Sequence, residues 1–389
     1  MYYNFTFVGA VKGEVKSEIK ALGSKGARKE TISFMLAGGD NKQYVQFELW
    51  KNKTQKDLAT GKEVEILPTQ VPIMQMKSDG KSESVKVDFV NRKAEHLIKN
   101  APNFVKKDCF GETFITYDQD FADKLLSKNE DKTYTYLKEG TRLYVKGTVT
   151  YYKSKKNGKV YPNYMIESIR LAKEDEKDLF QVLAEVYFTK DAIDPVQFDG
   201  TNLTDQAFVD GIVPIQVWVA QKNDFNDKTK VNYVDLTLTL NLTKIKDRTA
   251  VANLIERLDI MLEDFQAEEG QVKCIQVKYE PFKGAETVEL SEEELVKTMP
   301  DRVKKYYQKN MMTLDEAKYS MGITKEKVDE FRFKAFGISP KYANGAELMA
   351  FTVDDVLATQ VEEVAQETVV QASAVDLLIT QTQELEDLL

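Results

Sequence analysis

Alternating apolar and polar positions predict β-strands at the start of the chain. In the third such segment Val45, Phe47 and Leu49 share one face, and the polar residues between them share the other. Side chains of a strand point to opposite faces in turn, so one face is predicted to pack into a core. A loop rich in Gly, Ser and Lys is predicted at residues 16–29. The alternating segments, which predict a three-stranded meander, are residues 5–11, 31–37 and 44–50.

Two more strands are predicted further along, after a short helix at residues 121–126. Residues 141–152 alternate, and residues 160–171 return after Asn157-Gly158, a dipeptide typical of a hairpin turn. Residues 51–118 have no single period, and we expect an insertion with short strands of its own, such as 85–90. The core face of the long strand is predicted to carry Leu143, Val145, Val149 and Tyr151.

A second β-rich unit is predicted after the charged segment 174–178, which has the composition of a linker. An amphipathic helix is expected from 248 to about 266, with Leu254 and Leu258 among the apolar positions that pack on the unit. The predicted strands lie near residues 180–189, 212–220, 231–242 and 272–279.

The C-terminal part is predicted to be helical and then flexible. Ser291–Glu294 and Thr313–Glu316 match capping boxes, and Thr324 is expected to begin a helix that ends near Gly337. The predicted fold is therefore mainly β with a helical C-terminal part, in which β-barrel units stand in tandem. The predicted domains are residues 1–172 with the insertion at 51–118, a second barrel at 179–290, a basic helical module at 291–345 and an acidic flexible tail at 346–389.

Charge is distributed unevenly over the 389 residues. The net charge of the whole chain is −9, but residues 1–172 carry +9, residues 173–299 carry −12, residues 300–341 carry +4 and residues 342–389 carry −10. With 42% hydrophobic and 30% charged residues, the composition is that of a globular protein. The basic first half predicts a polyanion-binding module, and the acidic end predicts a separate interaction segment.

Few residues are available for metal or nucleophilic chemistry. Cys109 and Cys274 lie far apart without C-x-x-C spacing, which predicts buried reduced thiols. The single histidine, His96, is expected on an ordinary helix face. Asp118 and Asp120 form a D-x-D sequence that is expected on a surface loop rather than at a metal.

Nucleotide-binding and membrane functions also find no support in the sequence. Gly80-Lys81-Ser82 resembles the end of a phosphate-binding loop, but Gln75 stands where that loop requires glycine. No apolar stretch approaches the roughly 18 residues of a membrane-spanning helix, and no secretory signal is visible. We therefore expect a cytoplasmic protein that is not an enzyme and needs no cofactor or metal.

Basic residues interleaved with aromatic residues on the polar strand faces are the most informative feature. Single-stranded nucleic acid is bound by this mixture, because cations follow the phosphates while exposed rings stack on unpaired bases. The candidate nucleic-acid-binding residues are Tyr44, Trp50, Lys51, Arg142, Tyr144, Lys146, Tyr152, Lys153, Lys155, Lys156 and Lys159.

Three segments resemble single-stranded DNA-binding proteins with the oligonucleotide-binding (OB) fold. They are residues 44–51, the approach 137–140 and the strand start 141–147 before the basic hairpin. The resemblance implies the order strand, strand, strand, helix, strand, strand in the first unit. It implies stacking of Trp50 on DNA and a further aromatic site near Tyr152.

The same resemblance extends to the end of the chain, where Glu384–Leu389 is acidic with terminal apolar residues. It implies that this segment recruits replication or recombination proteins, and that the chain is a divergent viral or mobile-element relative in a bacterial or phage-infected cell. The expected function is sequence-nonspecific coating of single-stranded DNA. Two alternatives are a structural or assembly protein whose barrels contact other proteins, and a duplex binder with a helix-turn-helix at 313–336.

Overall fold

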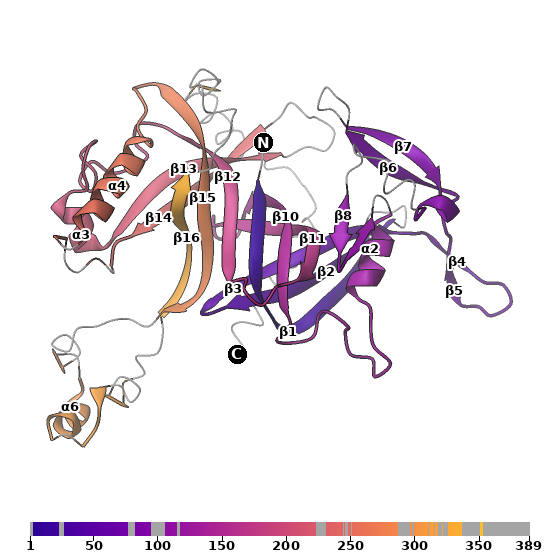
Figure 1. The fold of residues 1–389 in the computed structure, drawn as a ribbon, viewed down its shortest axis with the longest axis horizontal. Coiled ribbons are helices and arrows are strands. Elements are labelled where there is room, and N and C mark those ends of the chain that lie inside the picture. The colour runs from indigo at the N-terminus through magenta and orange to yellow at the C-terminus, as the bar shows by residue number, and fades with distance from the viewer. Residues whose placement is uncertain are drawn as a thin grey trace.

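One large mixed β-sheet dominates the structure, a computed structural model, and confirms the mainly β prediction (Figure 1). Among the residues that the structure describes, thirteen strands belong to this sheet, and two separate two-stranded sheets accompany it. The structure describes residues 3–22, 27–76, 82–94, 106–114, 117–222, 231–243, 245, 248–249, 251–286, 296–297, 299–309, 311–314, 316–317, 321, 326–336 and 351–352.

The first unit is a closed five-stranded barrel with a helix between its third and fourth strands. Neighbouring strands pair antiparallel, and the barrel closes where the third and fifth strands pair in parallel, at Gln46 and Met165. This confirms the predicted strand and helix order, which is that of the OB fold. The elements are β1 (Asn4–Leu22), β2 (Ala27–Gly38), β3 (Asn41–Lys51), α2 (Asp118–Leu125), β10 (Arg142–Lys153) and β11 (Val160–Leu171).

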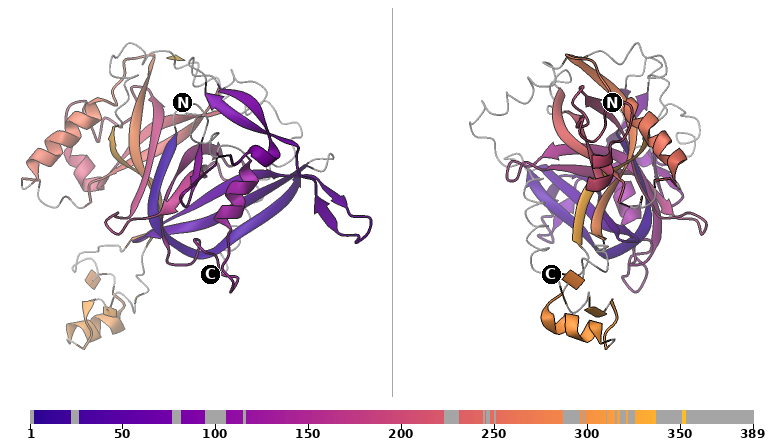
Figure 2. Two further views of the ribbon diagram at one scale, coloured as in Figure 1. Left: turned by 45° about the vertical axis from the view of Figure 1, so that its right-hand side comes forward. Right: turned by 90° about the vertical axis from the view of Figure 1, so that its left-hand side faces the viewer.

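The strand β1 is longer than predicted, because it continues through most of the expected loop at 16–29 and forms a hairpin with β2. Lys12 pairs with Met35 and Lys16 pairs with Ser33, so β1 carries two extra residues at this bulge. The bulge bends the strand, and its second half extends the sheet beyond the barrel (Figure 2). Hairpin pairing over the described residues explains why the polar composition of this segment does not produce a loop.

The second unit repeats the same closed order. Its third and fifth strands pair in parallel at Leu238 and Phe331, and its helix again lies between the third and fourth strands. A short helix, α3 (Asp205–Asp210), precedes the second strand. The elements of this barrel are β12 (Leu179–Phe188), β13 (Ile212–Lys222), β14 (Val231–Asn241), α4 (Ala252–Glu263), β15 (Gln271–Glu286) and β16 (Glu326–Phe336).

The strand β16 corrects the predicted helix after Thr324, and with it the helix-turn-helix alternative. Phe331 and Phe333 alternate with Arg332 along the strand, and the side chain of Phe333 is buried in the core. Pairing with β14 and β15 decides the conformation here, against a local sequence that also suits a helix. The Thr313–Glu316 capping box is present, since the Glu316 N–H donates to Thr313 Oγ1 (3.2 Å) and the Thr313 N–H donates to Glu316 Oε2 (2.7 Å).

Several other predictions are refined or fall outside the described residues. Leu254, in the first turn of α4, is exposed instead of packing on the barrel. His96, the Ser291–Glu294 capping box and most of the tail lie outside the described residues, apart from β17 (Phe351–Thr352), which pairs with β15. The predicted division into domains stays a prediction.

The insertion at 51–118 contains only short elements in its described part. Its ion pairs attach it to α2: Asp120 is buried, not on a surface loop, and accepts hydrogen bonds from Arg92 at 2.6 and 2.8 Å, while Asp118 pairs with Lys107. The elements are β4 (Thr54–Lys56), β5 (Glu63–Glu65), β6 (Gln70–Met76), β7 (Ser82–Asp88), the 3₁₀ helix η1 (Phe89–Asn91), β8 (Lys107–Cys109) and β9 (Glu112–Phe114).

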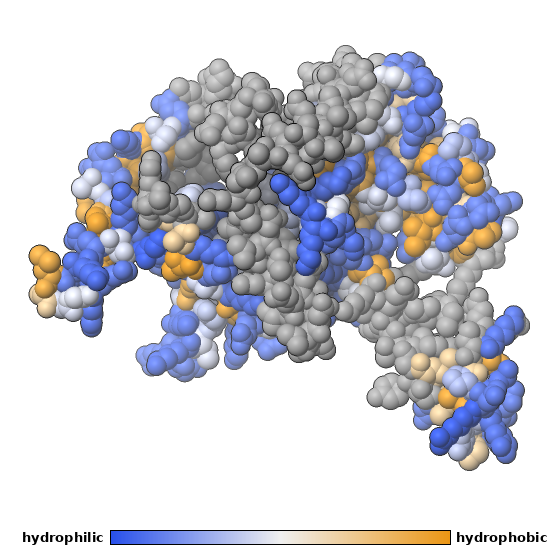
Figure 3. Space-filling model, turned by 180° about the vertical axis from the view of Figure 1, so that it is seen from behind, coloured by the Kyte–Doolittle hydropathy of each residue, from blue (hydrophilic) through white to orange (hydrophobic). Residues whose placement is uncertain are grey.

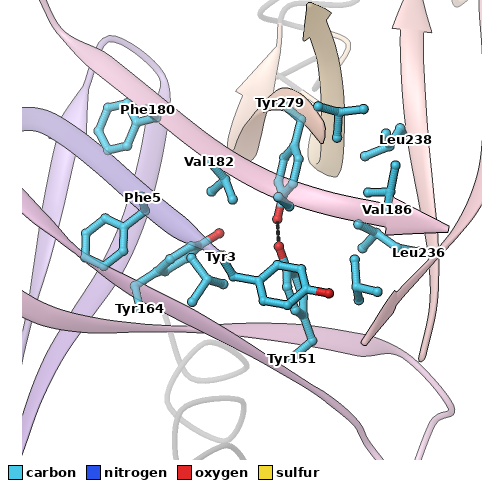
Figure 4. Packing of buried hydrophobic residues seen from close by; sticks show 14 of the residues in the cluster. Tyr3, Phe5, Tyr151, Tyr164, Phe180, Val182, Val186, Leu236, Leu238 and Tyr279 are labelled. Carbon is cyan, nitrogen blue, oxygen red and sulfur yellow. Dashed lines mark hydrogen bonds between the residues drawn. The ribbon is translucent and has the colours of Figure 1, made fainter. Parts of the chain in front are cut away.

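The two barrels share one hydrophobic core. The strands β1 and β12 pair antiparallel from Asn4 to Val8, and buried side chains of both barrels form a single cluster. Figure 4 shows Tyr151 of β10 hydrogen-bonded through its hydroxyl to the hydroxyl of Tyr279 of β15. Nearby, the Ala220 N–H donates to the hydroxyl of Tyr3 at 2.8 Å. Burial raises the pKa of Tyr151 and of Tyr279 well above 10.0, so both phenols are neutral in the fold.

The tyrosine pair predicts a non-additive effect of mutation. Tyr151→Phe or Tyr279→Phe alone leaves one buried hydroxyl without its partner, which costs about 1 to 3 kcal/mol of unfolding free energy. The double variant removes both groups, so we expect it to be less destabilised than the sum of the two single variants. Urea unfolding of the four proteins measures this coupling. Strict additivity would mean that the two hydroxyls do not stabilise the contact between the barrels.

Candidate nucleic-acid interface

Outward side chains of β1, β2 and β3 line up in rows across the first barrel. Directly paired residues of antiparallel strands have their side chains on the same face. The rows follow from the register as Lys12–Met35–Tyr44, Lys16–Ser33–Gln46, Glu18–Thr31–Glu48 and Lys20–Lys29–Trp50, with Lys42 opposite Ala37 beyond the first row. We call the outward side chains of Lys12, Lys16, Lys20, Lys29, Lys42, Tyr44 and Trp50 the basic sheet face.

The aromatic members of the basic sheet face are open to solvent. Trp50 is 64% exposed and Tyr44 is 42% exposed, while Val45, Phe47 and Leu49 on the other side of β3 are buried. The predicted division of β3 into two faces is therefore confirmed. Tyr44 and Trp50 are six residues apart, which corresponds to about 20 Å along a strand that rises about 3.4 Å per residue. Two ring platforms thus lie at the two ends of the lysine rows.

Cations outnumber anions on this face. Lys29 pairs with Glu48 at 2.6 Å and Lys20 lies 3.4 Å from Glu18, which neutralises two of the five lysines. Within the described part of the chain, no ion pair involves Lys12, Lys16 or Lys42. These three exposed ammonium groups remain available for the phosphates of a bound polyanion.

The hairpin between β10 and β11 lies at the Lys42 end of the face, because β3 and β11 run in parallel and begin side by side. Gly158 has a φ of +68° there, and its N–H donates to the Ser154 carbonyl at 2.9 Å. Lys155, Lys156 and Lys159 are exposed, and none of them has an ion pair with a described residue. The hairpin therefore extends the positive surface beyond the start of β3.

Two further predicted residues lie where this hairpin joins the barrel. Tyr152 of β10 stacks on Tyr161 of β11, with ring centroids 5.6 Å apart and planes at 24°. Lys153 pairs with Asp235 of β14 at 3.0 Å, so its charge is directed toward the second barrel. Tyr152 thus lies beside the basic hairpin, whereas Lys153 contributes to the contact between barrels.

Lys51 is placed differently from the prediction. Its ammonium group lies 3.2 Å from Glu30 and donates to Gln119 at 2.6 Å, and its side chain is only 15% exposed. The carboxylate of Glu30 is buried, so the charge of Lys51 is already neutralised by a fixed partner. We therefore assign Lys51 to the stability of the barrel.

Arg142, Tyr144 and Lys146 lie on β10, on the other side of β1 from the rows that cross β2 and β3. Arg142 pairs with Asp178 at 2.6 Å, and the guanidinium of Arg170 lies 3.9 Å from the ring centre of Tyr144. Lys146 lies 5.2 Å from the same ring centre. The structure thus places Lys146 and Arg170 at the ring of Tyr144 and pairs Arg142 with Asp178, instead of joining these residues to Trp50.

Arg170 connects this group to the segment between the barrels. It donates to both carboxylate oxygens of Glu176, and this hydrogen bonding lowers the pKa of Glu176 to about 2. Arg142 also donates to the Glu176 carbonyl at 2.8 Å. Arg142 of β10 and Arg170 of β11 therefore hold the connecting segment in place.

The sequence interpretation misses all five lysines of the face. It assigns no side of a strand to Lys16, Lys20 and Lys29, because it expects a loop at residues 16–29. Lys12 stands one residue after the alternating segment 5–11, and Lys42 stands two residues before the segment 44–50. A signal is present in the sequence: lysines at every fourth position from 12 to 20 share one side of a strand.

The second barrel presents a different surface at the equivalent place. The outward rows of β13 and β14 are Trp218–Asp235, Gln216–Thr237 and Pro214–Thr239. These three rows, whose side chains the structure describes, contain one carboxylate and no cation. Over these rows, the two barrels therefore share a strand order but not a basic surface.

The two cysteines are buried, as predicted, and burial raises the pKa of Cys109 to about 12. Within the described residues, no group of three His, Cys, Asp or Glu side chains could hold a metal ion. The described helices include none that is long and apolar enough to cross a membrane.

Fold and surface together define a tandem OB-barrel chain whose first barrel carries a basic, aromatic sheet face. No protein-family model matches the chain, and no curated protein sequence matches it. One solved structure that is similar is a deletion mutant of the single-stranded DNA-binding protein from Thermus aquaticus, with 12% sequence identity and a TM-score of 0.28. The match covers 72% of this chain and 86% of the other. The residues of the two barrels, and not this match, support the function proposed below.

Proposed function

We propose that the chain is a non-catalytic protein that binds single-stranded DNA on its first barrel. The observation that carries the proposal is the basic sheet face. Its unpaired lysines, Lys12, Lys16 and Lys42, lie in or next to the row of the exposed Tyr44, and the exposed Trp50 lies at the other end of the face. Lysines bind phosphates and release counterions, and rings such as Trp50 and Tyr44 stack on bases that are not paired. The strands β2 and β3 and the two flanking hairpins are also the elements with which OB folds bind oligonucleotides.

The bound strand would run from Trp50 along the lysine rows to the hairpin with Lys155 and Lys156. Duplex DNA is disfavoured on this path, since its bases are stacked on each other and cannot cover Trp50. Contacts to phosphates and to base faces do not distinguish the hydrogen-bonding edges of the bases, so we expect little sequence preference.

In the cell, this activity would coat and protect single strands during replication or recombination, in a bacterial or phage-infected cytoplasm. The acidic end, Glu384–Leu389, would recruit partner proteins; it lies outside the described residues, and its role rests on sequence alone.

A fluorescence titration of the full-length protein tests the proposal. Labelled oligo-dT, oligo-U and duplex are compared at about 50 mM and about 200 mM salt. We expect oligo-dT to bind more tightly than duplex, with affinity that falls steeply with salt. Equal affinity for duplex and single strand, or no binding to either, would contradict the proposal.

Trp50→Ala isolates the stacking contribution. Loss of the ring is expected to weaken oligo-dT binding by about 1 to 3 kcal/mol. Because Trp50 is 64% exposed, the melting temperature should change little. Trp50→Phe keeps an aromatic face and is expected to recover part of the affinity. A large drop in melting temperature with unchanged affinity would instead assign Trp50 to packing.

A second candidate function, protein contact, is favoured by exposed apolar side chains on the helices of the second barrel, namely Val209 of α3 and Leu254 and Ile260 of α4. An assembly protein would use such a surface without needing the lysine rows. Self-association in sizing chromatography that Leu254→Ser and Ile260→Ser abolish, together with absent DNA binding, would support this alternative.

A further inference from the structure

The connection between β15 and β16 contains a small unit of its own. Its helix, α6 (Asp301–Gln308), packs on an apolar cluster centred on Met299 and Ala317, separate from the core of the barrels. Figures 1 and 2 show α6 well away from both barrels in all three views. The barrels therefore do not cover the outer face of this helix.

Side chains of α6 divide into two faces. Val303 and Tyr307 contact the apolar cluster, and they are four residues apart on one side of the helix. On the other side, the spacing i, i+3, i+4, i+7 brings together Arg302, Lys305, Tyr306 and Lys309. All four are exposed, and Tyr306 is 39% exposed.

Charge on this outer face is positive. Among the described residues, none of Arg302, Lys305 and Lys309 has an ion pair, and the one acidic residue of α6, Asp301, is at its N-terminus. Figure 3 shows mainly hydrophilic side chains on the visible surface of the unit. The composition of the face, three cations around one exposed ring, is the mixture found on the basic sheet face.

The place of α6 in the topology provides an independent observation. In both barrels the fourth strand is followed by a connection to the fifth, which is β10 to β11 in the first and β15 to β16 in the second. The first connection carries the exposed Lys155, Lys156 and Lys159, and the second carries α6. The equivalent connection therefore carries exposed cations in each barrel.

We infer that the outer face of α6 binds the sugar–phosphate backbone of a single strand that extends beyond the first barrel. This inference rests on the proposed function and adds a second contact to it. Arg302, Lys305 and Lys309 would bind phosphates, and Tyr306 would stack on a base. Only strands longer than the site on the first barrel would reach α6, so its contribution depends on length.

The test uses the full-length protein with Arg302→Gln, Lys305→Gln and Lys309→Gln combined. Oligo-dT is used at about 8 nucleotides, within the roughly 4 to 16 that one barrel covers, and at about 48 nucleotides. At about 0.1 M salt we expect roughly 100-fold weaker binding of the long strand, and a salt slope smaller by about 2, since each neutralised phosphate contributes about 0.7. Binding of the short strand should not change.

A matched control removes three other exposed lysines without ion pairs to described residues, through Lys132→Gln, Lys138→Gln and Lys177→Gln. It changes net charge equally and should leave both affinities within about twofold of wild type. Equal affinity of the α6 variant and the control for the long strand would overturn the inference, as would an equal loss with the short strand. If the wild type binds neither oligonucleotide, the proposed function itself fails.

Discussion

Full-length protein with Lys12→Gln, Lys16→Gln and Lys42→Gln is expected to bind short oligo-dT about 100-fold more weakly in about 0.1 M salt. These three lysines belong to the basic sheet face and have no ion pair with a described residue, so their removal leaves no described carboxylate unpaired. The dependence of log affinity on log salt should become shallower by about 2, because three phosphate contacts of about 0.7 each are lost. Titrations at four or more salt concentrations measure this slope.

Lys51→Gln is the informative comparison for that variant. Its partner Glu30 is buried, so the substitution leaves a buried carboxylate without its cation and should lower the melting temperature. The salt slope of the folded protein should be unchanged. If instead Lys51→Gln makes the slope shallower and the triple variant does not, the assignment of the two sets of lysines is wrong.

Gly147→Ala is expected to prevent the first barrel from closing. A Cβ atom at this position would lie 1.8 Å from the carbonyl oxygen of Met165 and 2.8 Å from the ring of Phe5. The oxygen belongs to the backbone of β11, so relief requires β10 and β11 to separate. We expect a loss of more than about 3 kcal/mol in unfolding free energy, at the upper end for overpacked cores. Urea unfolding of the full-length protein measures it.

Gly140→Ala separates crowding from backbone strain in this experiment. Gly140 has a φ of +83°, and no atom lies within 4 Å of the place that an alanine Cβ would take, so alanine there meets strain alone. That strain costs about 1 to 2 kcal/mol. Similar midpoints of urea unfolding for Gly147→Ala and Gly140→Ala would show that β10 and β11 are farther apart at Gly147 than in the structure.

The alternation of apolar and polar residues along single strands predicts much of the fold. The alternation around Val45 and Val145 gives the faces of β3 and β10 directly, because each strand buries one side only. The strand β16 could not be predicted in this way, since Phe331, Phe333 and the charged residues between them also suit a helix. Its partners, β14 and β15, are distant in sequence, and barrel closure alone selects the strand.

The candidate site also contains residues that the local sequence predicts and residues whose role depends on distant partners. Tyr44, Trp50 and the hairpin lysines were predictable, since strand period or turn chemistry alone turns them outward. Lys51 and Arg142 were not, because their partners Glu30 and Asp178 lie 21 and 36 residues away in the chain. A charge on a strand is available to a ligand only when no distant part of the chain neutralises it.

The bulge in β1 constrains which insertions and deletions this protein tolerates. Two extra residues between Lys12 and Lys16 preserve the alternation, so lysines on both sides of the bulge face outward. Losing or gaining a single residue there would turn Lys16 and Lys20 toward the inner side of the hairpin and bring Ser17 and Ile19 outward. Changes in length at this point should therefore occur in pairs among functional variants, and a library of random insertions selected for DNA binding would recover even lengths and lose odd ones.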